Sequence, residues 1–149
     1  MNTINTFPKL VVFSEALTDL IIAASDNSDT WHSKTGGAGW NVSRAASWLG
    51  IKSAFAGAIS EDCFGEALYK ASDEAGLDLR FLQRVAKNPL LAIVHQTSPV
   101  SYFFIGDDSA DLYFDPLKLP EGWETHVKWA YFGGISLARA PLNTRLVNI

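Results

Sequence analysis

Strand patterns alternate with helical patterns in the first half of this 149-residue chain, and this alternation constrains its fold most strongly. Residues 9–14 and 51–59 are short apolar runs typical of buried strands. A helical pattern separates them, ends before Gly50, and carries an apolar stripe of Val42, Ala45, Ala46 and Leu49. A second helix is predicted from about residue 63 to 75. The order indicates an α/β fold with a parallel sheet.

Residues suited to cap a helix support the second helix, and the remaining segments suggest a separate sheet. Ser60 or Asp62 is a suitable N-cap, and Gly76 is a suitable residue after the last turn. Residues 18–24 and 29–35 predict a small hairpin outside the main sheet. Three further strands without a helix between them predict an added antiparallel patch, at residues 79–85, 90–96 and 101–106.

The last third of the chain predicts one more strand and a helix. Residues 126–134 indicate another buried strand, and residues 140–149 indicate a helix that begins at Pro141.

Composition excludes several classes of function. The formal net charge is −4, which provides no basic surface for nucleic acid or for an anionic membrane. The apolar runs fall far short of the roughly 18 residues that span a bilayer. A single cysteine, Cys63, excludes an internal disulfide, and together with the absence of a signal-peptide pattern it predicts a cytoplasmic location. His32, His95 and His126 are too scattered to predict a metal site.

Three glycines, Gly36, Gly37 and Gly39, stand directly before the first helix and require a reason. A dinucleotide fingerprint is disfavoured, because Val42 occupies the position of its third glycine and no buried strand precedes it. A phosphate loop fails, because the string G-x-x-x-x-G-K-[ST] is absent. A hydroxyl-binding loop remains, in which free backbone N–H groups approach a polar ligand.

Two side chains could complete such a hydroxyl site. Asn41 lies one turn into the helix, and its amide provides donors and an acceptor. Asp19 is expected at the carboxyl end of the first strand, where ligands of open α/β sheets bind. Plain alternatives stay open: Gly36 and Gly37 as a helix-entry turn, Asp19 as a turn residue and Asn41 as a cap of its own helix.

The same residues resemble a known family. The string GGAGWNVSRAASWLGIKSAFAGAISEDCFG is similar to the first signature of the ribokinase-like (PfkB) carbohydrate kinases, and SEALTDLI resembles their first strand with its sugar-binding aspartate. YFFIGDDSADLYF and WAYFGGISLARAPL resemble fructokinase and 2-keto-3-deoxygluconate kinase members. The resemblance implies a doubly wound α/β domain with a small β-sheet lid, formed by strands near 18–35 and 79–106, that often also mediates dimers.

The resemblance also implies an activity and a set of site residues. Members transfer the γ-phosphoryl group of ATP, with Mg²⁺, to a sugar hydroxyl. Asp19, Gly36, Gly37 and Asn41 would hold the sugar, and Phe104 on the last lid strand would close over it, although Phe104 as ordinary lid core is an open alternative. The implied partners are a small-molecule sugar and a second copy that binds through the lid strands.

The sequence departs from the family in one major respect. The second signature, an Asp-Thr-x-Gly-Ala-Gly-Asp type string with the catalytic aspartate, is absent, as are the Mg²⁺-associated motif and the ATP-binding half. We therefore expect residues 1–149 to be the N-terminal part of a single ribokinase-like domain, with no catalytic or metal-binding residue of its own. The full-length protein would phosphorylate the sugar. The alternative is a non-catalytic, truncated sugar-binding or dimerisation module.

A smaller departure concerns the substrate. Gly106 stands where kinases of keto-acid sugars tend to place an arginine. A neutral, fructose-like ketose or hexose is therefore expected rather than a sugar acid.

Overall fold

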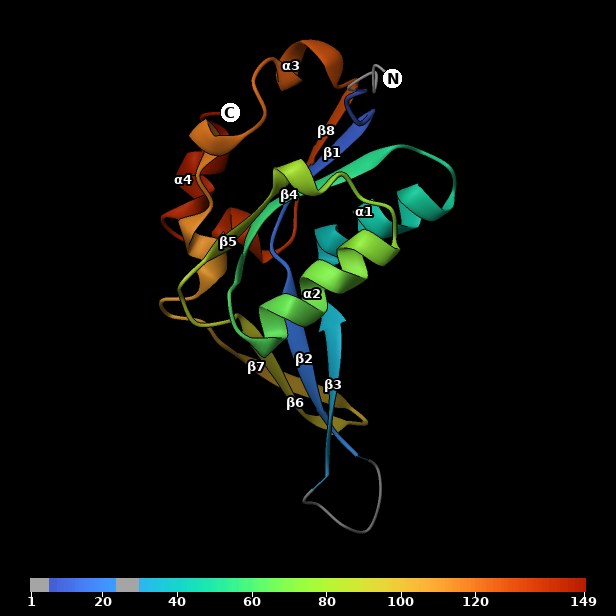
Figure 1. Ribbon diagram of the computed structural model, residues 1–149. Coiled ribbons are helices and arrows are strands. Elements are labelled where there is room, and N and C mark those ends of the chain that lie inside the picture. Colours follow the sequence, from blue (N-terminus) through green and yellow to red (C-terminus); the bar gives the residue numbers. More distant parts are fainter. Residues whose placement is uncertain (1–5, 24–29) are drawn as a thin grey trace.

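Two four-stranded sheets form the framework of the computed structural model, which describes residues 6–23 and 30–149 (Figure 1). The main sheet is parallel throughout. Its strands, in spatial order, are β5 (Leu82–Val85), β4 (Ser53–Ser60), β1 (Leu10–Phe13) and β8 (Trp129–Phe132). The second sheet extends from one end of the main sheet. Its order is β3 (Trp31–Gly36), β2 (Leu17–Ile22), β6 (Leu91–Thr97) and β7 (Val100–Ile105).

Both faces of the main sheet are covered. All eight residues of β4 are buried, and their side chains alternate between two apolar clusters. Phe55 and Ile59 pack with helices α1 (Ala38–Trp48) and α2 (Cys63–Glu74). Ala54, Ala56 and Ala58 pack in the other cluster, with the 3₁₀ turn η2 (Ala110–Tyr113) and helix α4 (Leu142–Val147). The predicted α/β, doubly wound class is therefore confirmed.

The remaining short elements lie in the second half of the chain. They are η1 (Leu79–Phe81), η3 (Pro116–Lys118), α3 (Trp123–His126) and η4 (Ile135–Ala138). In Figure 1, α1 and α2 lie together on one side of the main sheet, and α4 lies on the other.

The predicted helix boundaries follow from local chemistry. Asp62 is the N-cap of α2, and its Oδ1 accepts hydrogen bonds from the backbone N–H groups of Phe64 and Gly65 at 2.9 and 3.0 Å. Gly50 and Gly76 follow the two long helices with φ of +82° and +71°, a conformation that other residues rarely adopt. These endings are confirmed.

The second sheet is partly as predicted. β2 and β3 form the antiparallel hairpin, β6 pairs antiparallel with β7, and β2 joins them by pairing parallel with β6. Residues 24–29, which lie between the two strands of this hairpin, are outside the described residues. The assignment of residues 79–85 to this sheet is wrong. Residues 79–81 form η1, and β5 joins the main sheet parallel to β4. A short apolar run does not reveal which sheet it enters.

The strand predicted at 126–134 is present as β8, but it is exposed rather than buried. It lies at the edge of the main sheet, so only β1 covers one of its sides. The exposed fractions of Trp129 and Tyr131 are 70% and 41%. The helix expected from 140 is α4, which follows Pro141. Within residues 6–23 and 30–149, no helix combines the length and apolarity that crossing a bilayer requires.

Candidate functional site

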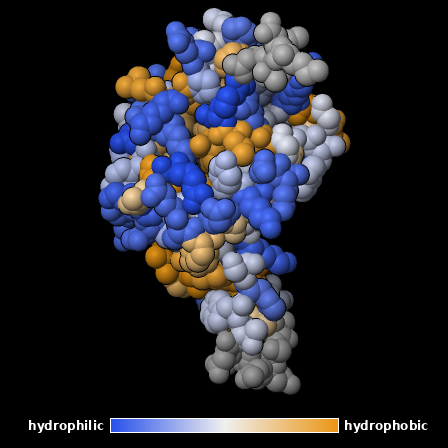
Figure 2. All heavy atoms as spheres, viewed as in Figure 1, coloured by the Kyte–Doolittle hydropathy of each residue, from blue (hydrophilic) through white to orange (hydrophobic). Residues whose placement is uncertain are grey.

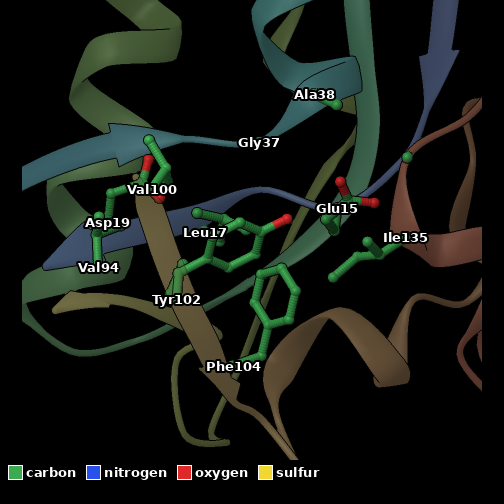
Figure 3. Close-up of a pocket in the computed structure, with 12 residues that line it drawn as sticks. Glu15, Leu17, Asp19, Gly37, Ala38, Val94, Val100, Tyr102, Phe104 and Ile135 are labelled. Carbon is green, nitrogen blue, oxygen red and sulfur yellow. The ribbon is translucent and has the colours of Figure 1, made fainter. Parts of the chain in front are cut away.

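A cavity of about 440 Å³ lies where the two sheets meet (Figure 3). The chain leaves β1, crosses through residues 14–16 and enters β2, so the second sheet begins at the carboxyl edge of the parallel sheet. Ligands of open α/β sheets bind at this edge. The cavity is lined by alternate residues of β2, β6 and β7, by the start of α1 and by the segment after β8. These residues are Glu15, Leu17, Asp19, Gly37, Ala38, Ala92, Val94, Val100, Tyr102, Phe104, Gly134 and Ile135.

Asp19 lies in this wall, but at a different place from the one predicted. It is the third residue of β2, in the second sheet, and not the end of the first strand. It forms one row across the sheet with Ala92 and Phe104. Burial raises the pKa of the Asp19 carboxyl above its ordinary value of 3.8, because a partly dry site disfavours the charged form.

Gly36 lies against the Asp19 carboxylate. Gly36 is buried at the end of β3, and a Cβ at this position would lie 2.4 Å from Asp19 Oδ2. The missing side chain therefore makes room for the carboxylate. Gly36 itself is not one of the described residues that line the cavity.

Gly37 forms part of the cavity wall and begins α1. Its φ of +121° is accessible to glycine alone among the common residues, and a Cβ would meet the backbone oxygen of Glu15 at 2.5 Å. As the N-cap it offers no side chain to the first-turn N–H groups, which have no partner within the helix. The helix begins at the cavity wall, which Gly37 and Ala38 line.

Two aromatic rings from β7 form the opposite wall. Phe104, which was predicted, lines the cavity with 39% of its surface exposed. Tyr102, which sequence analysis missed, lines it too, because residues two apart share one face of a strand. That period was the signal that could have found it. In Figure 3, Asp19 and Glu15 lie toward opposite ends of the cavity, with the two rings between them.

Glu15 is the other residue that sequence analysis missed. Its side chain lines the cavity although only 2% of the residue is exposed. An acidic residue directly after a buried apolar strand was the available signal, since buried carboxylates require specific partners.

Asn41 lies apart from these residues. It is exposed in the first turn of α1, and it is not among the described residues that line the cavity. Its backbone N–H donates to the Gly37 carbonyl at 2.9 Å. A role for Asn41 in ligand binding stays a prediction.

The chemistry of the cavity wall is that of a site for hydroxyl groups. Two carboxylates accept hydrogen bonds, a helix start donates them, and two rings provide an apolar surface. No lysine, arginine or histidine is among the described residues that line it. In the described part of the chain, no three His, Cys, Asp or Glu side chains are grouped so that they could hold a metal ion.

Comparison with known proteins agrees with this arrangement. Residues 8–148 match the pfkB family carbohydrate kinase family. The chain is 29% identical to a 5-dehydro-2-deoxygluconokinase of Bacillus velezensis, over 75% of this chain and 35% of that protein. It is also 29% identical to a fructokinase of Escherichia coli, over 73% of this chain and 36% of that protein.

Solved structures show the same fold. A Xylella fastidiosa fructokinase with bound ATP matches with a TM-score of 0.85 at 24% identity, over 95% of this chain and 44% of that one. An uncharacterized sugar kinase of Pyrococcus horikoshii in complex with ATP matches with a TM-score of 0.82 at 25% identity, over 93% and 47%. The chain spans between 35% and 41% of the length of the curated relatives it matches.

Proposed function

Because the chain belongs to the pfkB family of carbohydrate kinases, we propose that the protein carrying it transfers the γ-phosphoryl group of ATP to a hydroxyl of a sugar. The chain would supply the sugar-binding wall and the lid. Asp19 would accept hydrogen bonds from sugar hydroxyls, Gly36 would make room for its carboxylate, and Gly37 would form part of the floor of the site. Asn41 would contribute from the first turn of α1, and Phe104 would cover the sugar.

The cavity at the junction of the two sheets is the observation that carries this proposal. It combines an acceptor in a partly dry setting, Asp19, with donors at a helix start and a ring on the facing strand. Sugars present hydroxyl groups at their edges and C–H groups on their faces. A wall of this composition can bind both, with about 1.5–3 kcal/mol for each hydrogen bond to a charged group.

We propose a neutral, fructose-like ketose or hexose as the substrate. The described lining residues include two carboxylates and no cation, so an anionic sugar acid would meet like charge here. The name of the Escherichia coli relative, a fructokinase, is in line with this choice, whereas the name of the Bacillus velezensis relative, a 5-dehydro-2-deoxygluconokinase, points to a sugar acid for that protein.

The residues of this chain do not fit Mg²⁺-ATP. The described part lacks an acidic cluster for a metal ion, and the sequence lacks the second glycine-rich signature. ATP and Mg²⁺ are proposed for the longer protein alone, and no step is assigned to them here. Phosphoryl transfer depends almost wholly on positioning and charge stabilisation, so this chain by itself should be inactive. We expect the protein in the cytoplasm.

A second candidate is a non-catalytic module that dimerises through the lid strands. The observation in its favour is an exposed apolar face of β7, on which Phe103 and Ile105 are 51% and 52% exposed. Apolar side chains gather on the surface around β6 and β7 (Figure 2). Sedimentation equilibrium tests this candidate. A dimer that Phe103→Asp dissociates would support it, and a monomer at all concentrations would exclude it.

The main test is ATP-dependent phosphorylation over a panel of ketoses, hexoses and sugar acids. It compares the 149-residue chain with the longest protein that its gene encodes. We expect activity toward a neutral sugar in the longer protein, lost in Asp19→Asn and kept in Asp73→Asn, an identical change on the exposed face of α2. No phosphorylation of any sugar by either protein would contradict a kinase function.

A further inference from the structure

Glu15 is a buried carboxylate that the proposed function does not use. It lies between the two sheets with only 2% of its surface exposed, and no cation pairs with it among the described residues. A buried carboxylate is costly unless hydrogen bonds satisfy it. Its presence here therefore requires a specific set of donors.

Only one of its two oxygens has donors from the described residues. Oε2 accepts from the backbone N–H of Ser136 at 3.0 Å and from the Ser136 hydroxyl. The Ser14 hydroxyl lies 3.1 Å from Oε2 and 2.9 Å from the Gly133 carbonyl, and is shared between them. These contacts hold the carboxylate against the first turn of η4 and fix its orientation.

Gly134 packs directly against the same carboxylate. A Cβ at Gly134 would lie 2.4 Å from Oε1 and 2.5 Å from Oε2, so a larger residue would displace it. The second oxygen, Oε1, accepts no hydrogen bond from the described residues, and the side chain lines the cavity (Figure 3). A charged acceptor with a fixed orientation is thus left at the cavity wall without a protein donor.

We propose that Oε1 of Glu15 accepts a hydrogen bond from a hydroxyl of the bound sugar, at the end of the cavity away from Asp19. This inference rests on the proposed function and extends it to substrate choice. With carboxylates at both ends and no cation among the described lining residues, the site selects a neutral polyhydroxylated ligand and rejects an anionic sugar acid.

Glu15→Gln tests the role of the charge with little change in shape. The Gln oxygen should face the Ser136 donors, which leaves its NH₂ group toward the cavity. Isothermal titration with the longer protein would measure binding of fructose and of 2-keto-3-deoxygluconate. We expect fructose to bind about 5-fold more weakly, because the charged acceptor for the sugar hydroxyl is replaced by a neutral NH₂ donor. The sugar acid should bind unchanged or more tightly.

Ser136→Ala is the matched control, because it removes a donor to Oε2 and keeps the charge of Glu15. Its preference between the two ligands should equal that of the wild type. A purely structural role of Glu15 predicts instead that both ligands weaken together in Glu15→Gln, and this result would overturn the inference. Unchanged binding of both ligands in Glu15→Gln would overturn it as well.

A crystal structure of the wild-type protein with fructose keeps the inference testable if Glu15→Gln does not fold. A sugar hydroxyl within about 3.2 Å of Oε1 is the expected result, and a longer separation would refute the contact. Failure of the proposed function has a different signature. In that case the wild type binds neither ligand, whereas failure of this inference alone leaves fructose binding intact.

Discussion

Gly36 and Gly37 are adjacent, yet a methyl group added to each would meet different atoms. At Gly36 the Cβ would lie 2.4 Å from Oδ2 of Asp19, the tip of a side chain that can rotate away. At Gly37 it would lie 2.5 Å from the Glu15 backbone oxygen and 3.0 Å from Ala16 Cα, which cannot move without the chain. The two alanine variants should therefore separate ligand binding from folding.

Gly37→Ala should mainly lose stability. Its φ of +121° and ψ of 129° lie outside the regions that alanine adopts, and a residue held there costs about 1–3 kcal/mol. The contact with the Glu15 backbone adds to this cost. For a loss of about 2–3 kcal/mol in a chain of this size, the melting temperature should fall by roughly 4–12 °C.

Gly36→Ala should keep its stability within about 1 kcal/mol, because alanine restricts the unfolded chain more than glycine does and the clash is with a movable group. Its effect falls on Asp19, whose carboxylate must leave its place. If the proposed sugar contact exists, the loss of one charge-assisted hydrogen bond should weaken binding about 10- to 100-fold.

Two measurements decide between these expectations. Differential scanning calorimetry gives the stability of each variant, and ¹³C NMR titration of the Asp19 carboxyl reports its surroundings without any ligand. In Gly36→Ala the displaced carboxyl should become more hydrated, so its pKa should fall toward the ordinary value. The reasoning is refuted if Gly36→Ala is as unstable as Gly37→Ala, or if the Asp19 pKa is unchanged in a folded Gly36→Ala protein.

The remaining predictions concern one partly buried carboxylate and two buried polar contacts. Burial raises the Asp19 pKa, so the folded state holds this proton more tightly than the unfolded state. The contribution of Asp19 to the free energy of unfolding should be fully present below pH 3.8 and should fall as pH rises through the raised pKa. Asp19→Asn should lack this fall in thermal melts between pH 3.5 and 7. Arg139→Met should cost about 2–4 kcal/mol in urea unfolding, because it leaves Asp111, 2% exposed and 3.0 Å from Arg139 Nε, without its cation. Trp40→Phe should cost about 1–3 kcal/mol, because the fully buried indole N–H donates to Ser72 Oγ at 2.9 Å.

For each of these three predictions, a specific result would contradict the reasoning. Lys70→Ala removes an exposed ion pair with Glu74 and should change stability by no more than about 0.5 kcal/mol, so an equal loss in Arg139→Met and Lys70→Ala would contradict the role of burial. A steeper loss of stability with pH in Asp19→Asn would reverse the sign argued above. A neutral Trp40→Phe would show that the indole hydrogen bond contributes nothing to stability.

Local patterns were sufficient for much of the fold. The helical pattern before Gly50 located α1, but the predicted apolar stripe is not its packed face. Val42 and Leu49 are 38% and 81% exposed, and the buried residues of α1 are Gly39, Trp40, Ser43 and Ala46. Asp62 marked the start of α2 through a cap that depends on neighbouring residues only. The resemblance of the glycine-rich stretch to a kinase signature led to the family that the comparison supports. Hydrophobic periodicity could not assign β5 to its sheet, because a four-residue strand has the same pattern in either place.

The residues of the candidate site also divide into those that the sequence predicted and those that it missed. Asp19, Gly37 and Phe104 were identified from residue type and motif, and each lines the cavity. Tyr102 and Glu15 were missed. The two-residue period of β7 could have identified Tyr102, whereas the place of Glu15 at the cavity depends on the crossing of the chain between the two sheets. Asn41 has the residue type for a hydroxyl site, but the start of α1 places it on the exposed side of the helix.

The sequence by itself determined the alternation of strands and helices, the ends of the two long helices and the presence of a glycine-lined loop, because these depend on neighbours within a few positions. Only the tertiary structure decided that residues 14–16 carry the chain from one sheet to the other, and that Glu15 meets Ser136 across the junction. Such contacts join residues more than a hundred positions apart, and no local pattern specifies them because they depend on how the two sheets pack.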